Sequence, residues 1–187
     1  MNKKTLTLTI AQYHDIINTM KTGFSGCRPN KHMAMSLVIE ANIGLRISDI
    51  LNLKLSDIVK DGERYRLNII EQKTKKERFF TVLTEAYQNL KIYCLENKIE
   101  PDERIFKFTE RGVQKKLKQV CDYFGYEGIS THSFRKFFAT QIYIDNDYNI
   151  ALVQKLLQHS TPAVTQNYIG IQPQQIEIAL KKHNYWQ

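Results

Sequence analysis

The sequence predicts an α+β fold that is mainly α, with a small antiparallel β-sheet or hairpin packed on a helical core. Helix start signals followed by apolar residues at helical spacing recur along most of the chain. Only the stretch from Tyr65 to Leu83 alternates apolar and polar residues and is rich in aromatic and β-branched types, so we expect two strands joined by the turn "QKTKKE". With 187 residues, the chain can bury one core and has no room for a second large domain.

The N-terminal helices are predicted from their start and stop signals. Thr9 and Gln12 form a capping box, so the first helix is expected from Ile10 to Lys21. A loop, "CRPNKH", should separate it from a mostly buried helix that ends at Gly44. A short apolar helix follows, with Ser48 as its candidate N-cap.

Each later helix follows a residue that favours the N-cap position. The predicted caps, in chain order, are Thr84, Thr109, Thr131, Asn149 and Thr161. Pro162 then occupies the first helical position of the helix that carries Tyr168. The last segment, "PQQIEIALKKHNYW", places Ile176, Ala179 and Leu180 on one helical stripe.

Composition and charge limit the possible classes of protein. Lysine and arginine outnumber aspartate and glutamate 27 to 19, giving a net charge of +8, as expected for a chain that meets a polyanion. The apolar runs are far shorter than the ~20 residues that span a bilayer, and the N-terminus lacks the apolar region of a signal peptide. Three cysteines without CxxC spacing argue against a disulfide framework and a zinc site, so we expect a cytoplasmic protein.

Four short motifs carry residues suited to chemistry. They are "GLRISDI" with Arg46, "EQKTKKERFF" with Lys73, "THSFRKFF" with His132 and Arg135, and "LQHSTPAVTQNY" with His159 and Tyr168. Each alone is weak, since HxxR is also found on solvated helix faces and an aromatic residue on a late helix is often simply packed. An arginine between apolar neighbours, such as Arg46, usually binds an anion.

Together, in order and spacing, the four motifs resemble the catalytic domain of tyrosine recombinases, the phage-integrase family of site-specific DNA recombinases. The family pattern has the arginine of "GLR", a lysine in a β-hairpin turn, HxxR opening a later helix, a His or Trp ending a short helix, and a tyrosine about nine residues on. All six positions are filled here, between about Leu8 and Gly170. A joint match in order is far more specific than any single motif.

The resemblance implies cleavage and rejoining of DNA strands by transesterification through a 3′-phosphotyrosine. Attack on phosphorus builds negative charge on the nonbridging oxygens, and the guanidinium groups of Arg46 and Arg135 would hold those oxygens. Tyr168 would be the nucleophile, and its phosphotyrosine would keep the bond energy for rejoining.

The resemblance also assigns the proton transfers. Lys73 would protonate the leaving 5′ oxygen, His132 would act as acid or base on the tyrosine proton, and His159 would donate a hydrogen bond to the phosphate. Asp49, one turn after Arg46, would brace the cluster. Lys75 and Lys76 lie in the same turn as Lys73 and are alternatives to it. The proline that usually follows in the next strand of the family is absent from "FFTVL", which leaves the register of that strand open.

Double-stranded DNA is the expected partner. The expected DNA-contacting lysines are Lys75, Lys76, Lys115, Lys118 and Lys136. We expect no metal and no cofactor, because the scheme needs none, no ligand cluster is evident, and neither GxGxxG nor GxxxxGK[ST] occurs.

The resemblance also suggests an organisation. Residues 1–187 would form a single catalytic domain without the N-terminal core-binding domain, either as a fragment or as a short natural form like the recombinases that invert fimbrial promoters. The tail, about 170–187, would dock on a neighbouring protomer or pack on its own domain. We expect a nucleoid-associated protein that is a monomer alone and a homotetramer on DNA.

Two rival functions stay open from sequence. A type IB topoisomerase uses similar chemistry, but such enzymes commonly carry lysine where this chain has His132. A DNA-binding regulator that kept the fold would gain nothing from the nucleophile Tyr168.

Overall fold

The computed structural model describes residues 5–70, 75, 77–159, 161–169, 180, 181 and 183. It divides into two compact units, Met1–Phe138 and Ala139–Gln187, and the boundary falls inside helix α6 (Thr131–Asp145). Each unit is described by itself below. Among the described residues, no helix is both long enough and apolar enough to cross a membrane.

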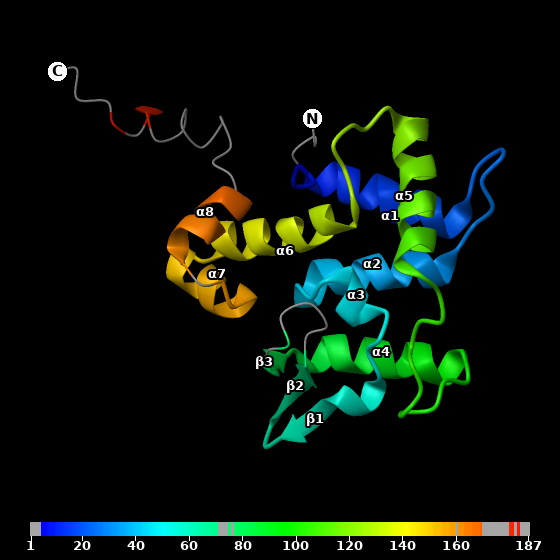
Figure 1. Cartoon of the computed structure of the whole chain (residues 1–187), viewed down its shortest axis with the longest axis horizontal. Helices are drawn as coiled ribbons and strands as arrows, with labels where there is room; N and C mark the ends of the chain where they lie inside the picture. The colour runs from blue at the N-terminus through cyan, green and yellow to red at the C-terminus, as the bar shows by residue number, and fades with distance from the viewer. Residues whose placement is uncertain are drawn as a thin grey trace. The chain divides into compact units, whose positions relative to one another are not determined.

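The first unit begins with two helices that pack on each other, α1 (Ile10–Thr22) and α2 (Lys31–Ile43) (Figure 1). The predicted capping box of α1 is confirmed, because the Thr9 hydroxyl accepts from the Gln12 amide and the Gln12 side chain accepts from the Thr9 amide. The loop "CRPNKH" is shorter than predicted, since the side chain of Asn30 caps α2 by accepting from the Met33 amide.

Three later start signals, Ser48, Thr84 and Thr131, were placed wrongly. In α3 (Ile47–Ile50), Arg46 holds the N-cap position, so Ser48 lies inside the helix instead of capping it. In α4 (Thr84–Glu96), Leu83 holds that position in an extended conformation, and Thr84 is already helical. In α3 and α4 the N-cap lies one or two residues earlier than predicted and makes no side-chain capping hydrogen bond.

The antiparallel sheet has three strands in the order β1 (Ile58–Asp61), β2 (Arg64–Ile70) and β3 (Glu77–Val82). The two predicted strands, β2 and β3, are confirmed, but β1 was missed. Its signal was the dipeptide Asp61-Gly62, which is typical of a tight hairpin. Gly62 has φ +64° in that turn.

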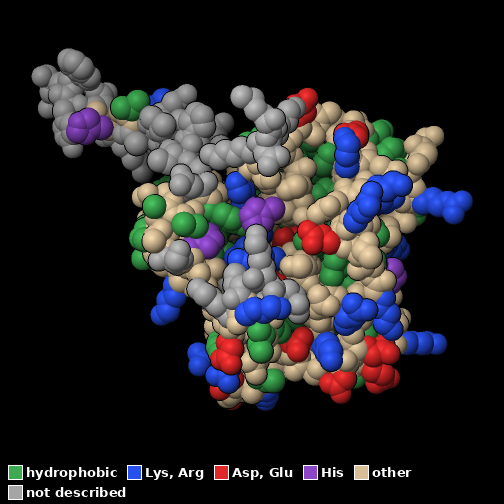
Figure 2. Space-filling view, viewed as in Figure 1, with side chains coloured by type: hydrophobic (Ala, Val, Ile, Leu, Met, Phe, Trp, Pro, Cys, Tyr) green, Lys and Arg blue, Asp and Glu red, His purple; other side chains and the backbone are tan. Residues whose placement is uncertain are grey.

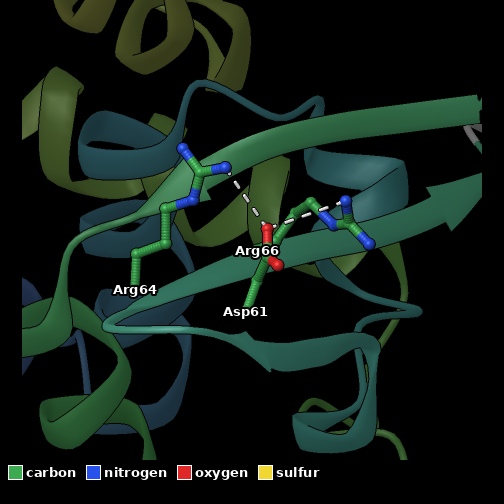
Figure 3. A network of polar contacts seen from close by, with 3 residues as sticks. All are labelled: Asp61, Arg64 and Arg66. Carbon is green, nitrogen blue, oxygen red and sulfur yellow. Dashed lines mark hydrogen bonds and ion pairs between the residues drawn. The ribbon is translucent and has the colours of Figure 1, made fainter.

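One face of the sheet packs on α4 and the other carries charged side chains. Leu67 is fully buried. The rings of Tyr65 on β2 and Tyr87 on α4 stack, with 3.8 Å between their centroids. On the opposite face, Asp61 lies 3.4 Å from Arg64 and 3.7 Å from Arg66 (Figure 3). These pairs are exposed, so they add little to stability.

The rest of the first unit is α5 (Glu110–Phe124), the 3₁₀ turn Leu55–Asp57, and the start of α6. Helix α5 packs on α1, and the predicted Thr109 cap is confirmed by its contact with the Gly112 amide. Thr131 is not a cap: α6 starts after Ser130, whose amide donates to the Ser133 hydroxyl at 3.1 Å.

The second unit holds the end of α6, α7 (Ile150–Leu157) and α8 (Pro162–Ile169), and α7 packs on α8. The predicted caps are confirmed, since Asn149 accepts from the Leu152 amide at 3.0 Å and Thr161 accepts from the Val164 amide at 3.4 Å. Of the predicted stripe in the tail, Ile176 and Ala179 lie outside the described residues; Leu180 is helical and exposed.

Candidate active site

Arg135 is the largest fully buried side chain among the described residues of the chain, with 1% of its surface exposed. It lies in the second turn of α6, and its Nη1 donates a 2.8 Å hydrogen bond to the backbone carbonyl of Gly44. Arginine is rarely buried to this extent unless it is paired. The contact therefore fixes the guanidinium against the turn that ends α2.

The turn at Gly44 also carries Arg46. Gly44 adopts a left-handed conformation with φ +67° and ψ +24°, and its amide donates to the Glu40 carbonyl at the end of α2. A side chain at Gly44 would collide with the ring of Phe138. Two residues later, Arg46 is half-buried at the N-cap position of α3. The structure thus brings Arg135 to the turn that precedes Arg46.

His132 and Asp49 occupy the same two elements. His132 is half-buried and lies one turn before Arg135 on α6, as the HxxR spacing predicts. Asp49 is 3% exposed and lies one turn after Arg46 on α3. Asp49 also lines a cavity of about 260 Å³, which Lys54 and the end of β2 line as well.

Glu40 is a buried acid that sequence reasoning missed. It lies on α2 with none of its side chain exposed. Burial raises the pKa of its carboxyl well above 4.5, the charge of Arg135 lowers it, and the charge of Glu110 raises it further. The Ile47 amide also lowers this pKa, although neither carboxylate oxygen has a partner that meets hydrogen-bond geometry within the described residues. The signal in the sequence was a lone acid in the apolar run "LVIEANI".

His159 and Tyr168 lie together in the second unit. His159 follows the end of α7, and its ring meets that of Tyr168 on α8 edge to face, with 5.0 Å between ring centroids. Helix α7 ends at Gln158, which adopts a left-handed conformation with φ +54°. Both rings are half-buried.

Thr165 orients this histidine and was also missed. Its hydroxyl lies 3.1 Å from His159 Nδ1, and the side chain is fully buried on α8. A partner on Nδ1 fixes which way the imidazole faces and leaves Nε2 for other contacts. The available signal was spacing, since Thr165 precedes Tyr168 by three residues and so shares its helix face.

The predicted DNA-contacting lysines differ in their surroundings. Lys115 on α5 is exposed, and Lys118, also exposed, pairs with Asp122 at 2.9 Å. In Figure 2, basic side chains lie over α5 at the right of the view. Lys75 is exposed, whereas the predicted catalytic Lys73 and its alternative Lys76 lie outside the described residues.

Lys136 is not on the open surface that its predicted DNA contact requires. It is 8% exposed, and its ammonium donates a 2.7 Å hydrogen bond to the Thr5 carbonyl. That contact ties the N-terminal segment to α6, so the structure supports a structural role for this side chain.

Chemically, the first unit offers a buried guanidinium and a second arginine at one turn, which suits an anion with two oxygens. The second unit offers a phenol beside an oriented imidazole, which suits proton transfer to or from the phenol. Within the described residues, no three His, Cys, Asp or Glu side chains are arranged to hold a metal ion.

Comparisons with known proteins identify the family of the chain. The model of the phage integrase family matches residues 7–175. A probable integrase/recombinase, YoeC of Bacillus subtilis, is 32% identical over 159 residues, covering 81% of this chain and 84% of that protein. Tyrosine recombinase XerC of Leptospira interrogans is 34% identical over 150 residues, but those residues are 74% of this chain and only 46% of that protein.

A solved structure shares the fold. The XerH site-specific recombinase, in a post-cleavage complex with its palindromic difH substrate, superposes with a TM-score of 0.71 at 19% identity. The match covers 96% of this chain and 54% of that one. The fold is thus that of a tyrosine-recombinase catalytic domain, as the sequence predicts. The chain belongs to the phage integrase family of tyrosine-type site-specific DNA recombinases.

Proposed function

We propose that this chain cleaves and rejoins double-stranded DNA at specific sites, with Tyr168 as the nucleophile. The observation that carries the proposal is the edge-to-face packing of His159 on Tyr168 at 5.0 Å, within the region that matches the family. The tyrosine oxygen attacks the scissile phosphorus, the bond to the 5′ oxygen breaks, and a 3′-phosphotyrosine forms. A 5′ hydroxyl of another strand then reverses the step and releases the tyrosine.

The remaining residues stabilise the charges of this step. Arg46 and Arg135 bind the nonbridging oxygens as charge builds on them, and guanidinium groups keep their protons while doing so. His159 donates a hydrogen bond to the same phosphate. Asp49 is a buried acid one turn from Arg46 and suits the bracing role.

Two residues transfer the protons of the cleavage step. His132 takes or returns the proton of the Tyr168 hydroxyl, and Lys73 gives a proton to the departing 5′ oxygen. Lys73 lies outside the described residues, and its role is supported by the antiparallel pairing of β2 with β3, the two strands that flank it in the sequence.

The recombinase works on DNA as an assembly. Its monomer binds duplex DNA through exposed lysines such as Lys75 and Lys115, in line with a net charge of +8, and forms a homotetramer on the duplex. Light scattering of the protein alone and mixed with cleaved duplex tests this: a monomer that becomes a four-protomer complex supports it, and a single protomer per duplex contradicts it.

The central experiment traps the covalent intermediate. The protein and its Tyr168→Phe variant are incubated with a pool of nicked duplexes of random sequence, from which the short fragment beside the nick diffuses away after cleavage. A protein–DNA band on a denaturing gel that needs Tyr168 and survives EDTA supports the proposal, and sequencing the trapped DNA identifies the site.

Two other outcomes separate the rivals. Relaxation of supercoiled plasmid without sequence preference would indicate a topoisomerase. Binding of duplex by both proteins without any covalent band would indicate a regulator and contradict the proposal.

A further inference from the structure

We propose that Thr165 is a positioning residue for strand cleavage: its hydroxyl donates to Nδ1 of His159, so that the imidazole keeps its proton on Nε2 and presents that nitrogen as a hydrogen-bond donor to the scissile phosphate. This inference rests on the proposed function, since it assigns His159 to the phosphate. It goes further by naming the protonated nitrogen and the residue that selects it. Thr165 itself touches no reacting atom and acts only through His159.

The contact between the two side chains is the first support. Thr165 Oγ1 lies 3.1 Å from His159 Nδ1, within the range of a hydrogen bond. Thr165 is fully buried on α8, and His159 is half-buried. Because buried hydroxyls are nearly always hydrogen-bonded, this contact satisfies Thr165 as well as orienting the imidazole.

The backbone of His159 is fixed separately, at the end of α7. Its amide donates to the Gln154 carbonyl at 3.1 Å, and its carbonyl accepts from the Gln154 side chain at 3.2 Å. Gln158, the residue before His159, has the left-handed conformation that is typical of such a helix end. Rotation of the side chain is therefore the main freedom left to His159, and the Thr165 hydroxyl is placed to restrict it.

Tyr168 confines the imidazole on a second side. It lies one turn after Thr165 on α8, so the two side chains share a helix face. The rings of His159 and Tyr168 lie 5.0 Å apart between centroids, with 70° between their planes. The imidazole therefore lies against the predicted nucleophile with Nδ1, and not Nε2, toward Thr165.

The needs of the hydroxyl decide which nitrogen carries the proton. A neutral imidazole has one N–H donor and one acceptor nitrogen. The buried hydroxyl of Thr165 needs an acceptor for its own proton, and within the described part of the chain only His159 Nδ1 meets hydrogen-bond geometry with it. When the hydroxyl donates to Nδ1, the proton of the neutral ring must lie on Nε2.

A hydroxyl also suits this place when the ring takes up a second proton. Nδ1–H then donates to the Thr165 oxygen, because a hydroxyl can accept as well as donate. Nε2 keeps its proton in both states of the ring. A carboxylate at the same place could only accept and would put the proton of the neutral ring on Nδ1, so that Nε2 would become an acceptor.

Preorganisation explains how a residue without substrate contact can affect the rate. A donor stabilises the charge that develops on a phosphoryl oxygen best when its position and its proton are set beforehand. If both tautomers of His159 were populated, part of the molecules would present a lone pair to an anionic oxygen. Loss of the Thr165 hydroxyl should therefore slow cleavage without changing the charge of the site.

The test reads the tautomer directly, by nitrogen-15 NMR of histidine-labelled full-length protein. The ring nitrogen shifts of the wild type, Thr165→Val and Thr165→Ser are recorded at pH 8.5, above the ordinary titration range of imidazole. The chain has five histidines, and the signals that a His159→Gln variant lacks are those of His159. Thr22→Val is the control, because it removes a hydroxyl that donates to the Asn18 carbonyl at 3.0 Å on α1.

We expect the wild type and Thr165→Ser to show His159 protonated on Nε2 alone, and Thr165→Val to show shifts averaged between the two tautomers. In single-turnover trapping of DNA at the same pH, Thr165→Val should cleave about fivefold more slowly, while its duplex affinity stays within about twofold of the wild type. Thr22→Val should match the wild type in both measurements.

Each other outcome counts against the inference. A wild-type ring protonated on Nδ1, or on both nitrogens, would overturn it, and so would an Nε2–H pattern that persists in Thr165→Val. Equal cleavage by the wild type and Thr165→Val would also overturn it. A shift of tautomer or a loss of rate in Thr165→Ser, or failure of Thr165→Val to fold, would make Thr165 a packing residue instead.

The proposed function can fail separately, because the spectra need no DNA. A trapped band that needs Tyr168, together with a wild-type ring protonated on Nδ1, would refute this inference alone. An Nε2–H pattern without any Tyr168-dependent band would refute the proposed function, and with it the use of this tautomer in cleavage.

Discussion

Arg135 donates a 2.8 Å hydrogen bond from its guanidinium to the carbonyl of Gly44, which lies 91 residues away along the chain. The bond joins the second turn of α6 to the left-handed residue that ends α2. It depends on a glycine for two reasons, the positive φ of +67° and the ring of Phe138 beside its Cα. The backbone of Gly44, which has no side chain, therefore holds the guanidinium of the predicted catalytic residue Arg135 in place.

Replacing Gly44 with alanine should lower the free energy of unfolding by about 3 kcal/mol. The left-handed conformation costs a side chain roughly 1–2 kcal/mol, and overpacking against Phe138 adds roughly 1–3 kcal/mol. Gly125→Ala is a matched control, because Gly125 also ends a helix with φ +69° but has no heavy atom near its added Cβ. Urea unfolding of both variants measures the difference. Equal losses would show that the contact with Phe138 relaxes freely.

The stability of Glu40→Gln should depend on pH differently from that of the wild type. The folded protein raises the pKa of this carboxyl above its usual 4.5, chiefly by burial. The unfolded chain therefore ionises first, and the stabilising contribution that is present below 4.5 is lost as the pH rises through the folded pKa. Glutamine cannot ionise, so the variant should match or exceed the wild type in Tm at pH 7.

Thermal scans from pH 4 to 8 check this prediction. The difference in Tm between the two proteins should increase with pH in favour of Glu40→Gln and then level off. A constant difference would mean that folding does not shift the pKa of Glu40 in this range.

Thr165→Val should slow strand cleavage while leaving DNA affinity nearly unchanged. The substitution removes the hydroxyl that lies 3.1 Å from His159 Nδ1, and a hydrogen bond of about 1 kcal/mol corresponds to roughly fivefold in rate. Thr165→Ser keeps the hydroxyl and should cleave close to the wild-type rate. Single-turnover kinetics distinguish the two, and an equal loss in both variants would point to packing as the cause.

Lys115→Met should weaken binding to duplex DNA and make that binding less sensitive to salt. Lys115 is exposed on α5, and each phosphate contact contributes about 0.9 to the slope of log K against log salt. Fluorescence anisotropy at several sodium chloride concentrations gives the slope. An unchanged slope would place the DNA elsewhere.

Lys136→Met should leave the salt dependence of DNA binding unchanged and should lower the free energy of unfolding instead. Its ammonium donates to the half-buried Thr5 carbonyl, and loss of a charged hydrogen bond costs roughly 1–3 kcal/mol. Urea unfolding measures the loss, with Lys115→Met as the comparison. A reduced salt slope for Lys136→Met would restore the predicted DNA contact.

Local patterns predicted the parts of the fold that depend on near neighbours. The caps at Thr9, Thr109 and Asn149 are confirmed because each acts on an amide three residues away. The predicted caps at Ser48, Thr84 and Thr131 were wrong, because all three residues already lie inside their helices. Strand β1 was missed although Asp61-Gly62 marks its turn.

The sequence by itself determined the family and the order of the candidate catalytic residues, because motifs at fixed spacing are a property of the chain. It also determined that His132 and Arg135 share a helix face and that a histidine precedes a tyrosine across a helix start. Only the tertiary structure decided which charges are buried and what they meet. Arg135 meets Gly44 across 91 residues, and Lys136 meets Thr5 across 131. The state of a charged group depends on its solvation and on neighbours brought by folding, and no local pattern records either.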